Sequence, residues 1–107
     1  MPLTLRTELG YTEALITDDG TLREFYRTAD ILNQDMHIKF VSKEDDFDSL
    51  NWAFRFKGHD LTLQYSIYTG ITVFPSKNDA AAPKDNKAVE DFATVLKATL
   101  DARSARV

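Results

Sequence analysis

The sequence of 107 residues carries 17 acidic and 13 basic side chains, which gives a net charge of −4, and it contains no cysteine. This length fits one domain, residues 1–107, because single cores typically span ~100–150 residues. The acidic balance argues against nucleic acid and anionic membranes as partners, and the lack of thiols excludes disulfides, thiolate zinc sites and cysteine nucleophiles.

The first third of the chain predicts two strands and a helix. Apolar and polar residues alternate over Leu3–Leu9 and again over Tyr11–Thr17, the period of two expected of half-buried strands. Thr21 and Glu24 then match a capping box, in which the threonine hydroxyl accepts from the Glu24 amide. Apolar residues at helical spacing follow, so we expect a helix over Leu22–Gln34.

The chain after this helix predicts a strand and then a polar connection. Met36–Phe40 alternates as a strand that leaves the helix directly. Lys43–Leu50 reads as a connection in which four carboxylates surround one aromatic residue: Glu44, Asp45, Asp46, Phe47 and Asp48.

Residues 51–75 predict a meander of three antiparallel strands with one apolar face. Gly58-His59 suits a two-residue type II′ turn, a register that pairs Phe56 with Leu61, Phe54 with Leu63, Trp52 with Tyr65, and Lys57 with Asp60. A three-residue loop at Tyr68-Thr69-Gly70, with Gly70 left-handed, then pairs Ile67 with Ile71 and Tyr65 with Val73. Pro75 is expected to end the last strand or to mark an edge.

The last part predicts a surface loop followed by a long amphipathic helix. The loop is expected over Ser76–Asp85, with Asp85 as the N-cap. The helical stripe comprises Ala88, Val89, Phe92, Val95, Leu96, Thr99 and Leu100. The elements therefore run β-β-α-β-β-β-β-α, which predicts an α+β two-layer sandwich: a mainly antiparallel sheet with both helices packed on one face.

Two groups of residues are candidates for binding a partner. The first is the acidic run Glu44–Asp48, in which Phe47 would serve as an apolar anchor for a basic protein, although the more favoured interpretation folds Phe47 onto the core. The run lacks the glycine and glutamate of a calcium loop. The second group is Tyr68 and Phe74, since Phe74 faces away from the apolar row and would be exposed on an edge strand unless Ser76–Asp85 covers it.

The two histidines are weak candidates for chemistry. His59 lies in a predicted turn, where polar residues are tolerated, and its neighbour Asp60 points to the opposite face of the strand. His37 and His59 do not show metal-ligand spacing. With no nucleophile motif or phosphate loop, the sequence leans away from an enzyme and predicts no metal and no cofactor.

The leading hypothesis is therefore a non-enzymatic protein-interaction module of regulatory, adaptor or inhibitor type, with a basic protein partner. The alternative is a small-ligand or enzymatic pocket between sheet and helices, formed by Tyr26, Trp52, Tyr65 and His59. A homodimer through the Ile71–Pro75 edge or the Phe74 face is a third possibility. Because no secretory leader or membrane span is visible, a soluble cytoplasmic protein is expected.

Overall fold

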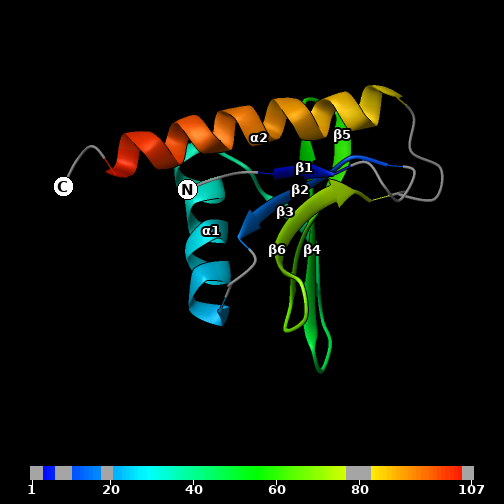
Figure 1. Cartoon of the computed structure of the whole chain (residues 1–107), viewed down its shortest axis with the longest axis vertical. Coiled ribbons are helices and arrows are strands. Elements are labelled where there is room, and N and C mark those ends of the chain that lie inside the picture. The colour runs from blue at the N-terminus through cyan, green and yellow to red at the C-terminus, as the bar shows by residue number, and fades with distance from the viewer. Residues whose placement is uncertain (1–3, 7–10, 18–20, 77–82, 105–107) are drawn as a thin grey trace.

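A computed structural model describes residues 4–6, 11–17, 21–76 and 83–104 as a six-stranded antiparallel sheet with two helices (Figure 1). The strands occur across the sheet in the order β1-β2-β6-β5-β4-β3, so β1 and β3 form its edges. The elements in chain order are β1 (Thr4–Arg6), β2 (Glu13–Thr17), α1 (Leu22–Asp35), β3 (Phe40–Asp45), β4 (Ser49–Phe56), β5 (His59–Ser66), β6 (Gly70–Pro75) and α2 (Pro83–Ser104).

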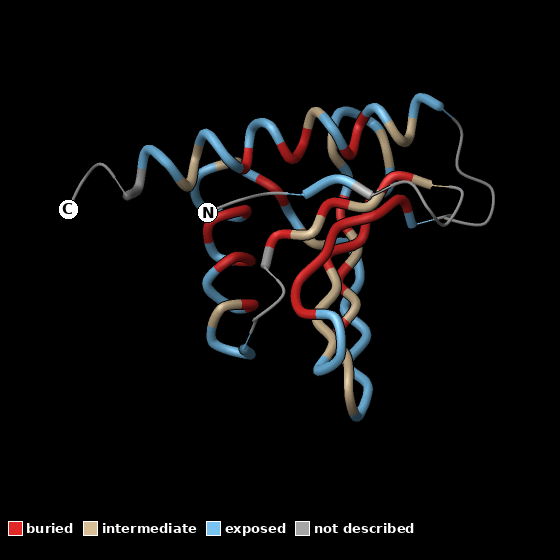
Figure 2. Tube along the Cα trace, in the orientation of Figure 1, coloured by how far each residue is buried: buried red, intermediate tan, exposed pale blue. Residues whose placement is uncertain are grey.

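Both helices pack on the same face of the sheet and share one core. Trp52 of β4 lies opposite Leu63 of β5, which lies opposite Val73 of β6, so these three side chains form a row on that face. The other strand residues in this core are Ala14, Ile16, Leu50, Phe54, Leu61 and Ile71. Figure 2 shows the buried segments of the strands and helices in red. The fully buried helix residues in this core are Phe25, Ile31 and Leu32 of α1, and Val89, Phe92 and Leu96 of α2. The predicted α+β sandwich is confirmed.

The β4–β5 turn differs from the predicted one by a single residue. Lys57 and Gly58 are the two central residues, and both have positive φ, 52° and 82°, as a type I′ turn requires. Phe54 therefore pairs with Leu61, and the predicted pairing of Phe56 with Leu61 is wrong by two residues. Because side chains alternate with a period of two, this error leaves every residue on its predicted face.

The β5–β6 loop is displaced in the same way. Its residues are Ile67–Thr69, and Gly70, at φ 82°, is the first residue of β6. Tyr65 pairs with Ile71 rather than with Val73. The left-handed conformation predicted for Gly70 is confirmed, but Ile67 leaves the apolar row and lies in the loop.

The charged pair across the β4–β5 hairpin also involves a different residue. Asp60 pairs with Arg55, and the Arg55 Nε lies 3.2 Å from the Asp60 Oδ1. The predicted contact with Lys57 is wrong because Lys57 is part of the turn.

Helix α1 begins as predicted, but the strand that follows it starts later than predicted. The Thr21 hydroxyl accepts from the Glu24 amide, so this part of the capping prediction is confirmed. After the helix, His37 has a φ of 56°, and the Ile38 amide donates to the Leu32 carbonyl. This left-handed residue closes the helix. The strand predicted over Met36–Phe40 therefore starts only at Phe40.

The predicted polar connection Lys43–Leu50 is instead the end of a hairpin. Strand β3 extends to Asp45 and β4 starts at Ser49, with Glu44 opposite Asn51. The connection itself is reduced to residues 46–48.

The remaining boundaries are close to those predicted. Helix α2 starts at Pro83, so Asp85 lies within its first turn and is not the N-cap. Proline is favoured at the first helical position, where its missing N–H costs nothing. Strands β1 and β2 are shorter than predicted, and the rest of the Leu3–Leu9 prediction lies outside the described residues.

Strand β6 lies inside the sheet, between β2 and β5. Within the Ile71–Pro75 segment, considered above as a possible homodimer edge, residues 71–73 thus pair with β2 on one side and with β5 on the other. Phe74 is buried, with its ring centroid 6.1 Å from that of Tyr11, so of the two alternatives the exposed position on an edge strand is wrong. Most of the loop expected to cover it, residues 77–82, lies outside the described residues.

Neither α1 nor the described part of α2 is long and apolar enough to cross a membrane.

Candidate functional site

Two loops meet at the end of the sheet that points away from α2. These are the β3–β4 turn, residues 46–48, and the β5–β6 loop, residues 67–69, which extend together at the lower end of Figure 1. The Ile67 amide donates to the Asp48 carbonyl at 3.3 Å, so the two loops are directly connected. We refer to Glu44–Asp48 together with Ile67 and Tyr68 as the hairpin tip.

The hairpin tip exposes three large apolar or aromatic side chains. Phe47 is fully exposed, Tyr68 is 79% exposed and Ile67 is 59% exposed. Phe47 was expected to fold onto the core, and the short β3–β4 turn prevents this because it holds the side chain beyond the last strand pair. Figure 2 shows the β5–β6 loop as exposed and the β3–β4 turn as partly exposed and partly intermediate.

The β3–β4 side of the hairpin tip also carries four carboxylates. Glu44, Asp45 and Asp46 are exposed and Asp48 is half-buried, whereas the segment 43–48 contains one basic residue, Lys43. The Lys43 ammonium is placed 4.3 Å from the Trp52 ring centroid, within reach of a cation–π contact. The hairpin tip therefore combines an excess of negative charge with exposed apolar side chains.

Several hydrogen bonds define the backbone of the hairpin tip. The Asp46 amide donates to the Ser49 carbonyl at 2.8 Å, and the Tyr68 amide donates to the Ser66 hydroxyl at 3.1 Å. The Trp52 indole Nε1 donates to the Asp45 Oδ1 at 2.9 Å, which joins the acidic run to the core. The exposed side chains thus project from a backbone whose position is set by these bonds.

Of the residues predicted to bind a partner, the structure brings together all except Phe74. Tyr68 and Glu44–Asp48 lie on adjacent loops, although they are separated by twenty residues or more in the sequence. Phe74 lies in an interior strand and is buried. Sequence reasoning missed Ile67, because the two-residue register error placed it on the apolar row.

The aromatic residues predicted to line a pocket, Tyr26, Trp52 and Tyr65, belong to one cluster around Phe25. The Phe25 ring centroid is 4.9 Å from that of Trp52 and 6.2 Å from that of Tyr65, and Tyr26 is 5.8 Å from Trp52. These are the tilted and edge-on contacts typical of a packed aromatic cluster. His59 does not belong to this cluster. It is the first residue of β5, and Tyr65 lies six residues further along the same strand, so the two residues are roughly 20 Å apart at the usual rise per strand residue.

His59 is oriented by a residue that the sequence did not indicate. Its Nδ1 lies 2.9 Å from the Asp85 Oδ1, and both side chains are about 30% exposed. Because an ionised carboxylate only accepts, Nδ1 carries the proton of this hydrogen bond. Strand β5 and helix α2 supply the pair across 26 residues of sequence, and no local spacing could have indicated it.

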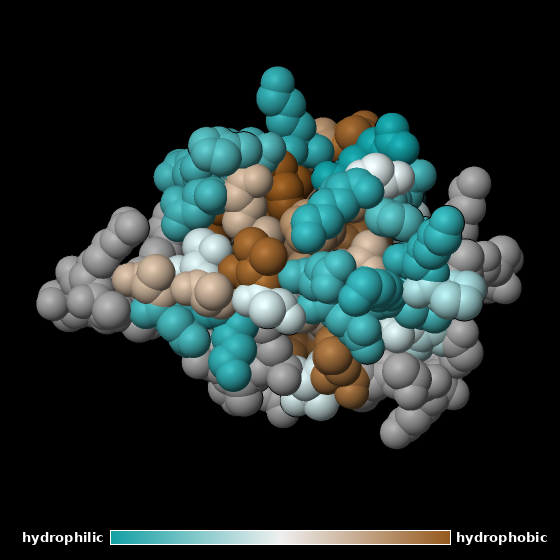
Figure 3. All heavy atoms as spheres, turned by 90° about the horizontal axis from the view of Figure 1, so that it is seen from above, coloured by the Kyte–Doolittle hydropathy of each residue, from teal (hydrophilic) through white to brown (hydrophobic). Residues whose placement is uncertain are grey.

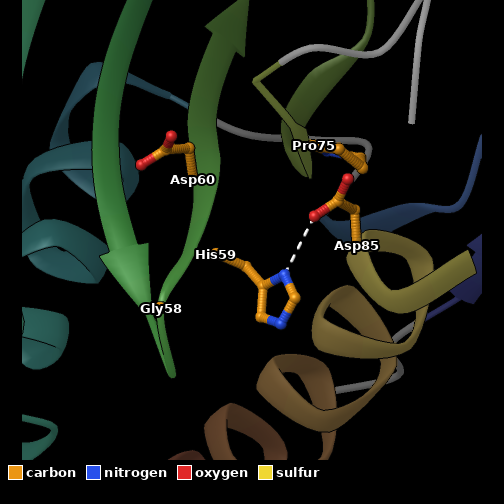
Figure 4. Close-up of a pocket in the computed structure, with 5 residues that line it drawn as sticks. All are labelled: Gly58, His59, Asp60, Pro75 and Asp85. Carbon is orange, nitrogen blue, oxygen red and sulfur yellow. Dashed lines mark hydrogen bonds and ion pairs between the residues drawn. The ribbon is translucent and has the colours of Figure 1, made fainter. Parts of the chain in front are cut away.

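Two pockets adjoin the His59 ring. The first, of about 170 Å³, is lined by Gly58, His59, Asp60, Pro75 and Asp85, and Figure 4 shows the dashed bond from His59 to Asp85 across it. The second, of about 230 Å³, is lined by Lys57, His59, Lys84, Lys87, Ala88 and Asp91. No group of three or more His, Asp or Glu side chains within the described residues is arranged to hold a metal ion.

Residues 6–98 match a protein family whose description is "Protein of unknown function (DUF3630)". This match covers most of the chain, so the chain belongs to that family. No curated protein and no solved structure matches the chain.

Proposed function

We propose that this member of the DUF3630 family is a non-enzymatic interaction module whose hairpin tip binds a basic segment of another protein. The observation that carries the proposal is the exposure of Phe47, Ile67 and Tyr68 on two connected loops that also carry the acidic run. Protein interfaces commonly combine apolar or aromatic anchors with a polar rim, and the hairpin tip has both parts.

The apolar side chains would supply most of the binding free energy. Burying a fully exposed phenylalanine contributes roughly 1.5–3 kcal/mol, and aromatic residues are frequent among those that dominate binding. Because hydrogen bonds fix the backbone of both loops, little conformational entropy would be lost when a partner covers them.

The carboxylates would determine which partner binds. Four carboxylates and one ammonium in residues 43–48 attract a basic segment and repel an acidic one. Arginine suits this surface better than lysine, because its guanidinium binds carboxylates in a bidentate manner and also stacks on exposed rings such as Phe47 and Tyr68. We therefore infer that the partner segment contains arginine next to apolar residues.

The face over α2 is a poorer docking surface. Seen from above, its hydrophobic residues appear as separate spots among hydrophilic ones (Figure 3). Among the large hydrophobic residues in the described part of α2, Val95 is exposed, and its exposed fraction is only 39%. The hairpin tip, in contrast, carries three large apolar or aromatic side chains, each more than half exposed, on two loops that a backbone hydrogen bond connects.

The proposal is tested by affinity capture from extract of the native source with the immobilised protein and two variants of equal charge. The tip variant carries Asp46→Asn, Phe47→Ala and Asp48→Asn. The control variant carries Glu90→Gln, Val95→Ala and Asp101→Asn on α2, which removes the same charge and another exposed apolar side chain. A partner identified with the wild type is then purified and titrated against all three proteins.

We expect the tip variant to bind this partner at least tenfold more weakly, since truncating a central anchor costs more than ~1 kcal/mol and each lost rim charge adds to it. Binding of the wild type should also weaken with rising salt, because exposed charges are screened. A partner that binds the tip variant as tightly as the control, or stoichiometric binding of a small molecule with no protein captured, would remove the proposal. A concentration-dependent dimer that the tip variant abolishes would assign the hairpin tip to self-association instead.

A further inference from the structure

The second pocket beside His59 gathers basic side chains at the end of the sheet opposite the hairpin tip. Lys57 comes from the β4–β5 turn, whereas Lys84 and Lys87 come from the first turns of α2. A chain with a net charge of −4 thus places three of its 13 lysine and arginine residues around one pocket. Lysine clusters around a concave site attract anions.

The His59 ring is held in a defined orientation beside these lysines. The hydrogen bond to Asp85 fixes the edge of the ring that carries Nδ1, and Figure 4 shows the second ring nitrogen on the side away from Asp85. A histidine whose Nδ1 donates to a carboxylate leaves Nε2 for another partner. That nitrogen accepts a hydrogen bond when the ring is neutral and donates one when the ring is protonated.

We propose that this pocket binds the phosphate group of a small ligand. A phosphate group has several oxygens that can contact three ammonium groups at once, and lysine is a common phosphate binder. A hydrogen phosphate also offers both a P–OH donor and P–O⁻ acceptors, so it complements the His59 Nε2 in either state of the ring. With a volume of about 230 Å³, the pocket lies below the roughly 300–1,000 Å³ of sites for drug-sized ligands and suits a small one.

The carboxylates near the pocket set the strength of this binding. Asp91 lines the pocket and lies 3.9 Å from the Lys87 ammonium, so it competes with an anion for that lysine. Asp85 is hydrogen-bonded to His59, and Asp60 is paired with Arg55. Lys57 and Lys84 have no carboxylate partner among the described residues, and they would therefore contribute most of the attraction.

The experiment is a titration of the full chain with sodium phosphate at constant ionic strength, followed by amide shifts in two-dimensional NMR spectra. Glycerol phosphate, in a second arm, distinguishes a phosphate monoester from free phosphate, and sodium acetate tests a carboxylate. The variants are Lys57→Gln, Lys84→Gln and Asp91→Asn. Lys97→Gln is the matched control, because Lys97 is exposed on the same helix but does not line the pocket.

We expect saturable shifts centred on Lys57–His59 and Lys84–Lys87 with phosphate or its monoester. Lys57→Gln and Lys84→Gln should each weaken binding roughly two- to fivefold, Asp91→Asn should tighten it by a similar factor, and Lys97→Gln should leave it unchanged. Shifts that do not saturate, that acetate reproduces, or that Lys97→Gln reduces as much as Lys84→Gln would overturn the proposal. The exchanged residues are exposed or half-buried and spectra of each variant report its folding directly.

Discussion

Trp52 is the residue that connects the core of the protein to its hairpin tip. Its ring packs against those of Phe25 and Phe40, at centroid distances of 4.9 and 5.2 Å, on the helix-covered face of the sheet. Its indole N–H donates to Asp45 at 2.9 Å, one residue before the β3–β4 turn. One side chain therefore takes part in the core and also positions the acidic run.

Replacing this tryptophan tests the hydrogen bond. Trp52→Phe keeps an aromatic ring in the cluster but removes the donor, so we expect the free energy of unfolding to fall by about 1–2 kcal/mol. Asp45→Asn retains an acceptor and should cost less than about 0.5 kcal/mol. Urea denaturation of both variants measures the two changes in the free energy of unfolding. If this free energy fell equally in both, the carboxylate charge rather than the indole donor would account for the stabilisation.

At the scale of elements, the β4–β5 hairpin carries a residue that its turn does not favour. A type I′ turn needs positive φ at both central positions and prefers asparagine followed by glycine. The structure has lysine at the first position, with a φ of 52°. Lysine adopts this conformation at a cost in free energy, which the pairing along all eight residues of β4 and β5 offsets.

Lys57→Asn should therefore stabilise the protein by about 0.5–1 kcal/mol, because asparagine adopts the left-handed conformation more readily. Lys57→Gln should have no such effect, since glutamine has the same backbone preference as lysine and removes the same charge. Thermal and urea unfolding of both variants measure the difference. If the turn were type II′ with Gly58 in its first position, Lys57→Asn would give no gain.

The two-residue period predicted the buried face of every central strand correctly, because alternation depends only on the local pattern of residues such as Trp52, Phe54 and Leu63. It could not fix the register, since a type I′ turn at Lys57-Gly58 and a type II′ turn at Gly58-His59 both place Gly58 at positive φ. It also placed Met36–Phe40 in a strand, because nothing in the alternation reveals a histidine of positive φ.

The candidate sites were predictable only in part for a similar reason. The acidic run was visible as a sequence feature, but its contact with Ile67 depends on the β5–β6 loop, which follows it in the chain by two strands. The pairing of His59 with Asp85 joins a strand to a helix and has no local signal.

At the scale of the whole molecule, the two ends of the sheet differ in chemistry. One end carries the exposed apolar side chains and carboxylates of the hairpin tip, and the other places Lys57, Lys84 and Lys87 around the pocket beside α2. The antiparallel sheet joins these ends, since β4 and β5 extend from one to the other (Figure 1). The two proposed sites share no residue, so we expect that a partner protein and a small phosphate ligand would not compete with each other.

The central claim, that the hairpin tip is the docking surface, is tested most directly by hydrogen exchange of the protein alone and in complex with its purified partner. Slower exchange in the complex is predicted for residues 43–49 and 66–70, with no change across α2. Protection that falls on α2 or on the helix-free face, with the hairpin tip unchanged, would contradict the claim.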